Sequence, residues 1–215
     1  MFSLFPMLNQ KVSRLPPPAV KLPKPAPFTT QEELLEKYTP ETNVGLCRSL
    51  SNIYAKEVLQ GRDPSLLLAN DRELINAAIN EENVEYRLQG QGLSEKDVSG
   101  LAFTLYSTTP PTTGIVKAGE MNKMLDDTLT TNDHVLLVIP TKDKGVKHEV
   151  YFGRDNVRYS NSKTDCRFFD ANLEGGERSA PCPKLLSEFK THLQQTYPID
   201  KDDGHFSAIP HPRKP

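Results

Sequence analysis

The spacing of apolar residues along the chain changes at about residue 134. This change is the sequence feature that most constrains the fold. Before it, apolar residues recur every three or four positions, which predicts amphipathic helices at about 31–38, 47–60, 71–82, 94–106 and 118–129. After it, β-branched or alternating segments predict strands at 134–139, 146–152, 157–159 and 167–170. A closing helix is expected at about 183–197. We therefore predict an α+β fold, with a helical half packed on an antiparallel sheet.

Prolines gather toward the two ends of the chain and suggest domain boundaries. The stretch from Pro16 to Pro27 favours extended polyproline conformations, so we expect residues 1–28 to be a disordered Pro-rich segment. A capping box beginning at Thr29 and Thr30 opens the first predicted helix. We expect a single domain over residues 29–200 and a flexible C-terminal tail over 201–215.

Charge and cysteine content exclude several classes of function. The net charge is -2 with interspersed signs, so no basic surface predicts a nucleic-acid partner. No apolar run approaches the roughly 20 residues of a membrane span, so no transmembrane segment is expected. The three cysteines include no C-x-x-C pair, and we interpret them as free thiols in a reducing compartment. We expect a monomer without a metal or an organic cofactor.

Three residues could form a nucleophilic site. Cys47 opens a predicted helix, where the unpaired amides and the helix dipole favour a thiolate, although a lone cysteine is also a common small core residue. Strand alternation places His148 on the face of Val150 and Phe152, where it is either a functional base or a satisfied core histidine. Asp170 ends an apolar strand, where a carboxylate needs a partner.

The chain order of these residues, cysteine then histidine then aspartate, is the order of papain-like active sites. Cys166 and Cys182 are interpreted as unreactive. His134, at the start of the first strand, is the rival to His148 as the base.

Sequence blocks around these residues add a more specific indication. Gly45-Leu46-Cys47-Arg48-Ser49-Leu50-Ser51, His148-Glu149-Val150-Tyr151 and Phe168-Phe169-Asp170-Ala171-Asn172 resemble the three motif blocks of the YopT/AvrPphB-type cysteine proteases. That family consists of papain-like bacterial effectors. The resemblance implies that Cys47, His148 and Asp170 form a catalytic triad. It also implies a host protein substrate, transient approach to a membrane through that substrate, and delivery by a type III-like route into the host cytosol.

The blocks depart from the family pattern at two positions. Glu149 stands where the family has a small residue, and Ala171 stands where it has proline. The side chain that would help to bind the oxyanion is not evident, because no glutamine closely precedes Cys47. Asn43 is the candidate for that role, and Asn172 is a rival to Asp170 for orienting the histidine.

Other functions remain open at the level of the sequence. The same triad serves glutamine deamidases and acyltransferases, which differ from proteases only in the leaving or accepting group. A different class is a non-enzymatic binding module, whose Pro-rich arm docks into aromatic grooves of a partner.

Overall fold

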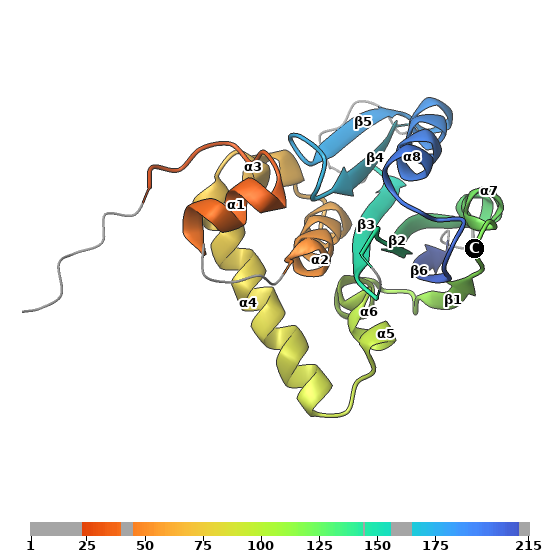
Figure 1. Cartoon of the computed structure of the whole chain (residues 1–215), viewed down its shortest axis with the longest axis horizontal. Coiled ribbons are helices and arrows are strands. Elements are labelled where there is room, and N and C mark those ends of the chain that lie inside the picture. The colour runs from red at the N-terminus through yellow and green to blue at the C-terminus, as the bar shows by residue number, and fades with distance from the viewer. Residues whose placement is uncertain (1–22, 40–44, 144, 156–164, 211–215) are drawn as a thin grey trace, which may run out of the picture.

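The computed structural model describes residues 23–39, 45–143, 145–155 and 165–210. Helices dominate the first half (Figure 1), with bounds α1 Gln31–Tyr38, α2 Cys47–Leu59, α3 Pro64–Leu68, α4 Asp71–Gly90, α5 Glu95–Val98 and α6 Leu101–Tyr106. Two further helices, α7 Met121–Thr131 and α8 Cys182–Thr196, lie among the strands. The periodicity of apolar residues therefore correctly predicted that the first half of the chain is helical.

The strands form one six-stranded sheet in the order β1-β6-β2-β3-β4-β5. Their bounds are β1 Thr112–Val116, β2 Asn132–Pro140, β3 Lys147–Arg154, β4 Asp165–Asp170, β5 Glu177–Pro181 and β6 Gly204–Pro210. Every neighbouring pair is antiparallel. The predicted α+β class, with helices packed on an antiparallel sheet, is confirmed.

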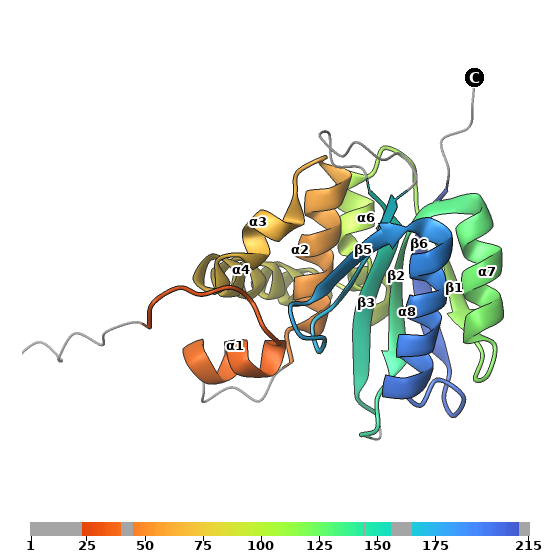
Figure 2. The same cartoon turned by 90° about the horizontal axis from the view of Figure 1, so that it is seen from above.

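The sheet separates two hydrophobic cores, so the molecule has three layers (Figure 2). Helix α2 lies on one face, where Tyr151 and Phe169 belong to the same core as Leu50. Helices α7 and α8 cover the other face, where Phe152 and Phe168 pack with Phe189. Alternation along β3 and β4 thus sends successive side chains to opposite cores. Below, these two sides are called the α2 face and the α8 face.

Local signals explain where several helices begin or break. Thr30 caps α1 by accepting a hydrogen bond from the Glu33 amide, and Asn70 caps α4 in the same way through Glu73. The single helix predicted over 94–106 is instead two, α5 and α6, divided at Gly100. Gly100 has a φ of 83°, and a Cβ there would meet Ser207 at 2.6 Å, so the chain turns where only glycine fits.

The predicted domain boundaries need correction at both ends. Phe28 is buried in the α2-face core, and its amide donates to the Leu68 carbonyl at 2.7 Å, so the folded part begins before residue 29. The expected C-terminal tail is wrong for residues 204–210, because β6 pairs with both β1 and β2 inside the sheet. The strand expected at 157–159 lies outside the described residues. No helix of the described part is long and apolar enough to span a membrane.

Candidate active site

Cys47 is the first residue of α2 and lies where the helix exposes its unpaired amides. The preceding residue, Leu46, makes no side-chain capping bond, so the positive end of the helix dipole lies beside Cys47. Apolar residues of the α2 core hold the helix against the sheet, and Leu50 and Val58 are almost completely buried. Cys47 is an intermediate-exposure residue and is the free cysteine of the structure.

His148 lies near the start of β3, on the same face as Val150 and Phe152, as strand alternation predicted. Its ring is buried and stacks on Tyr197 with the ring centroids 5.1 Å apart. The Nε2 atom is 2.7 Å from Asp170 Oδ1. The imidazole is also hydrogen-bonded to Cys47, and since Nε2 is engaged by the carboxylate, Nδ1 is the ring atom left for the thiol.

The two groups shift each other's proton affinity in opposite directions. Burial alone would raise the pKa of Cys47, but the hydrogen bond and charge of His148, with the amides of Glu149 and Arg48, bring it below its ordinary value. Burial alone would lower the pKa of His148, but its bonds to Asp170 and Cys47 raise it to about 10. These directions favour a thiolate and an imidazolium as the resting pair.

Asp170 is completely buried and accepts a hydrogen bond at every position that its two oxygens offer. Oδ1 receives His148 at 2.7 Å and the Asn172 amide at 2.8 Å. Oδ2 receives His192 Nε2 and the Tyr197 hydroxyl, both at 2.7 Å. Burial would raise the pKa of this carboxyl, but the bonds from His148 and His192 hold it well below its usual range. Asp170 is therefore a fixed anion.

His192 and Tyr197 are parts of this site that the sequence did not predict. A signal was present, because His192 stands three positions after Phe189, and Tyr197 four positions after Leu193, so all lie along the buried side of α8. That side faces Asp170 because α8 packs on β4. This packing could not be predicted from the sequence.

Asn172 and Gln31 extend the hydrogen-bond network toward solvent. Asn172 Nδ2 donates to the Tyr197 hydroxyl at 3.2 Å, and its Oδ1 accepts from Gln31 Nε2. The backbone N–H of Gln31 donates to the Ala171 carbonyl at 2.7 Å, which fixes the start of α1 beside the loop after β4. The Asn172 side chain therefore contacts Tyr197 and Gln31 and not His148. Asn43, the other candidate, lies outside the described residues.

Gln31 shares a cavity with Cys47 and His148, although it lies far upstream of the cysteine in sequence. This cavity of about 360 Å³ is also lined by Asn172, Tyr197 and the segment before β3. A second cavity, of about 130 Å³, also borders Cys47 and His148 and is lined by Glu149 among others. Cys47 therefore borders two cavities. No three acidic, histidine or cysteine side chains in the described part are grouped to hold a metal ion.

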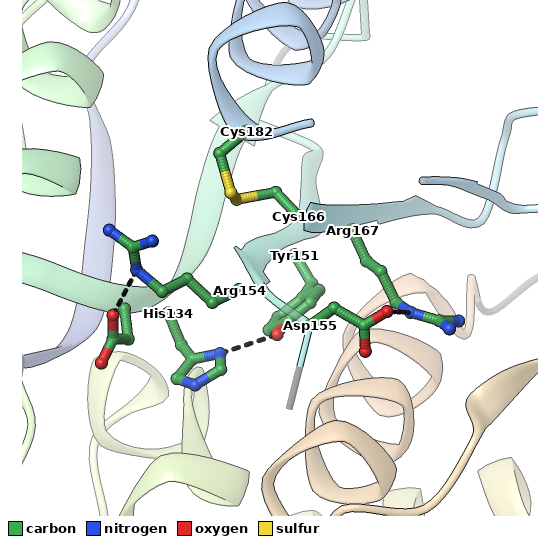
Figure 3. Close-up of a disulfide and its surroundings, with 8 residues drawn as sticks. His134, Tyr151, Arg154, Asp155, Cys166, Arg167 and Cys182 are labelled. Atoms are coloured by element: carbon green, nitrogen blue, oxygen red, sulfur yellow. Dashed lines mark hydrogen bonds and ion pairs between the residues drawn. A yellow bond between two sulfur atoms is a disulfide. The ribbon is translucent and has the colours of Figure 1, made fainter. Parts of the chain in front are cut away.

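Two expectations about the remaining cysteines and histidines are resolved. Cys166 and Cys182 form a disulfide that joins β4 to the start of α8 (Figure 3), so the expectation of three free thiols is wrong. Their Cα atoms are 4.7 Å apart, a contact that only the folded chain creates. His134 pairs with Gly153 of β3. Gly153 is five positions after His148, which separates His134 from His148 by roughly 16 Å along the sheet. The Nδ1 atom of His134 contacts the Tyr151 hydroxyl at 2.8 Å, so His134 is not placed to act on Cys47.

Comparisons with known proteins give a likeness among solved structures. No family model matches the chain, and no curated protein matches it. Among solved structures, the crystal structure of the Pseudomonas avirulence protein AvrPphB aligns with 76% of this chain and 90% of its own, at 14% identity and a TM-score of 0.49. The chain is similar to AvrPphB in its path. The roles of the side chains rest on the geometry of this chain alone.

Proposed function

We propose that this protein is a cysteine protease in which Cys47 is the nucleophile, His148 the base and Asp170 the residue that orients the histidine. The observation that carries the proposal is the continuous hydrogen-bonded series from the thiol through the imidazole to the buried carboxylate. A cysteine that lowers its pKa through a histidine, beside two open cavities, is the arrangement that nucleophilic catalysis on an acyl group requires.

The reaction begins from the ion pair. The Cys47 thiolate attacks the carbonyl carbon of an amide, and the carbonyl oxygen becomes an oxyanion. His148 then gives its proton to the leaving amine, which leaves an acyl-enzyme. A water molecule, which gives a proton to the now neutral imidazole, attacks the acyl carbon and releases the acid, and this step restores the thiolate–imidazolium pair. Asp170 keeps the ring in one orientation and stabilises its charged form throughout.

Two donors stand ready for the oxyanion in this scheme. One is the backbone amide of Cys47 at the free end of α2. The other is Gln31, because its Nε2 carries two hydrogens and gives only one of them to Asn172. In this proposal Gln31 has the role for which the sequence offered Asn43, which lies outside the described residues. The position of Asn172, between Gln31 and Tyr197, supports a structural role for that residue.

The biological setting of the proposal comes from the sequence resemblance. It indicates a host protein as the substrate and delivery into a host cell as an effector. A deamidase or an acyltransferase would use the same three residues, and peptide-bond cleavage is preferred here because the three motif blocks resemble those of proteases.

Selective alkylation tests the reactive thiol directly. Iodoacetamide at pH 7 should modify Cys47 stoichiometrically and faster than it modifies an unactivated exposed thiol, because the thiolate is the reacting form. Cys166 and Cys182 are held in a disulfide, so the labelled site is unambiguous by peptide mass. The His148→Ala variant is the matched control and should label slowly. Equal rates in both proteins would remove the basis for the triad.

Turnover is tested with a library of unbiased peptides, followed by mass spectrometry of the products. New termini should appear with the wild-type protein and be absent with Cys47→Ala. A glutamine converted to glutamate without chain cleavage would identify a deamidase instead.

A further inference from the structure

Glu149, the residue after the proposed base, is held by helix α2 at several points. Its backbone N–H is hydrogen-bonded to the sulfur of Cys47. The Ser51 hydroxyl donates to its backbone carbonyl at 2.9 Å, and Asn52 Nδ2 lies 3.4 Å from its Oε1. The pairing of β3 with β4 begins only at Val150, so at Glu149 these bonds join the strand to α2. Glu149 therefore connects the helix of the nucleophile to the strand of the base.

Asn52 extends this connection to two further elements. Its Oδ1 accepts the backbone N–H of Ala102, near the start of α6, at 2.9 Å, and its Nδ2 lies 3.5 Å from Glu85 Oε1 of α4. Ser99, which is buried just before α6, is hydrogen-bonded to the Glu149 carboxyl. Asn52 is 1% exposed and Glu149 is 2% exposed, so α2, α4, α6 and β3 meet at a buried polar cluster. A change in the Glu149 side chain therefore displaces the base relative to the nucleophile.

The charges around Glu149 disfavour a second carboxylate in this cluster. The guanidinium of Arg48 is already paired with Glu85 at 2.7 Å, and Lys147 is exposed to solvent. Burial raises the pKa of Glu149 well above its usual range, and the charges of Glu85 and Cys47 raise it further. The titratable groups that act on Glu149 or share the smaller cavity with it are Cys47 and Arg48 of α2, Glu82, Glu85 and Tyr86 of α4, and Lys147 and His148 of β3. These surroundings favour the uncharged carboxylic acid.

We infer that Glu149 is a positioning residue, which as an uncharged acid ties β3 to α2 and so holds its own backbone N–H against the sulfur of Cys47. This inference rests on the proposed function, since it adds a residue to the same site. A backbone N–H that donates to the sulfur stabilises the thiolate. An uncharged side chain adds no repelling charge beside that thiolate, whereas an ionised Glu149 would raise the pKa of Cys47.

The rate of alkylation of Cys47 by iodoacetamide, measured against pH, tests this role without turnover. Glu149→Ala loses the side-chain bonds to Asn52 and Ser99, so the backbone N–H is no longer fixed at the sulfur and the midpoint should rise. A rise of about one pKa unit slows labelling about tenfold at a pH below both midpoints. Glu149→Gln keeps an acceptor for Asn52 and an uncharged donor, so it should label within about twofold of the wild-type rate.

Two further variants separate positioning from a general loss of stability. Ser51→Ala keeps the Glu149 side chain but removes the bond to its carbonyl, so it should also raise the midpoint, and it decides the question if Glu149→Ala does not fold. Glu177→Ala is the matched control, because Glu177 of β5 accepts from the hydroxyl of Tyr54, about two turns along α2 from Cys47, at 2.6 Å. It should lower the midpoint of thermal unfolding and leave the midpoint of alkylation unchanged.

Three results would overturn the inference. One is a folded Glu149→Ala variant with the wild-type midpoint of alkylation. Another is a Glu149→Gln variant that labels as slowly as Glu149→Ala, because the site would then need a charged carboxylate. The third is a Glu149→Gln variant with a clearly lower midpoint than the wild-type protein, because the residue that it replaces would then be an anion.

Peptide cleavage provides the second measurement. In Glu149→Ala, kcat should fall about tenfold while KM changes little, and Glu149→Gln should recover most of kcat. A loss confined to KM would indicate that Glu149 contacts the substrate and would overturn the positioning role. If no peptide is cleaved, the proposed protease function fails, while the alkylation midpoints still decide whether Glu149 positions Cys47.

Discussion

The two faces of the sheet treat polar groups in opposite ways. On the α8 face, Asp170 is completely buried and all of its acceptor positions are filled by His148, His192, Tyr197 and a backbone amide. On the α2 face, Glu149 is almost as deeply buried, but Asn52 Nδ2 lies a long 3.4 Å from its Oε1, and burial raises the pKa of its carboxyl well above the usual range. The difference teaches that one face stabilises a buried carboxylate, whereas the other disfavours the charged form. Cys47 and His148 lie at the end of the sheet, between the α2 face and the α8 face.

Removing either member of the ion pair should have the largest effect. Cys47→Ala eliminates the covalent route, and His148→Ala removes both the counter-ion of the thiolate and the acid for the leaving amine. Peptide cleavage should fall by at least about 10⁴-fold in each variant. Thermal unfolding serves as the control, because neither change removes a large part of either core. A variant of Cys47 that still cleaved peptides would show that the nucleophile lies elsewhere.

Loss of the buried anion should have the next largest effect. Asp170→Ala retains the nucleophile and the base but frees the imidazole to change its orientation, so cleavage should fall by about 10³- to 10⁴-fold and leave a measurable remainder. Asn172→Ala should cost much less, because Asn172 contacts Tyr197 and Gln31 rather than His148. If Asn172→Ala were the more damaging of the two folded variants, the orienting role would belong to the amide.

The pH dependence of alkylation separates the ion pair from an ordinary cysteine. Because the pKa of Cys47 is lowered, its thiolate forms at lower pH than that of a free cysteine, so the rate should already be high at neutral pH and should rise little up to pH 9. The imidazolium persists until pH approaches the His148 pKa of about 10. In His148→Ala, burial remains and raises the pKa of Cys47. The midpoint of the alkylation rate against pH should therefore move above that of a free thiol. A midpoint shared by both proteins would contradict the pairing.

His192→Ala examines how far the α8 face supports the site. One hydrogen bond to a charged acceptor is lost, worth about 1.5–3 kcal/mol, so the midpoint of thermal unfolding should fall. Asp170 keeps its three other donors, and cleavage should fall by only about tenfold. The His192→Gln variant, which can restore a donor, should recover part of both losses. A loss of cleavage as large as that of Asp170→Ala would make His192 an equal partner of His148.

Much of this arrangement was predictable from the sequence, because it depends on local signals. Cys47 opens a helix, the strand period assigns His148 to the face of Val150, and an apolar strand ends at Asp170. These signals predicted the α+β class and named the three residues that the structure brings together. Periodicity and capping are properties of short segments, which explains their success.

The features that were missed depend on contacts between segments distant in sequence. Residues 204–210 show only a short apolar pattern followed by prolines, and they become a strand because β1 and β2 offer edges on both sides. Gln31 reaches the cavity of Cys47 because its amide is tied to Ala171. His192 reaches Asp170 only through the packing of α8 on β4. No local pattern in the sequence encodes such distances.

The disulfide provides the smallest expected effect on activity and the clearest test of the division between the faces. Cys166 and Cys182 are 16 positions apart and tie β4 to the start of α8 (Figure 3). Replacing both by serine should lower the free energy of unfolding by about 3 kcal/mol, because a loop of this length is no longer closed in the unfolded chain. Cleavage at 25 °C should remain within about twofold, since His192 and Tyr197 bind Asp170 from the far end of α8. Dithiothreitol should reproduce this result with the wild-type protein, which matters for a protein proposed to act in a reducing cytosol. A loss of cleavage in parallel with stability would show that the α8 face controls the reaction as well as the fold.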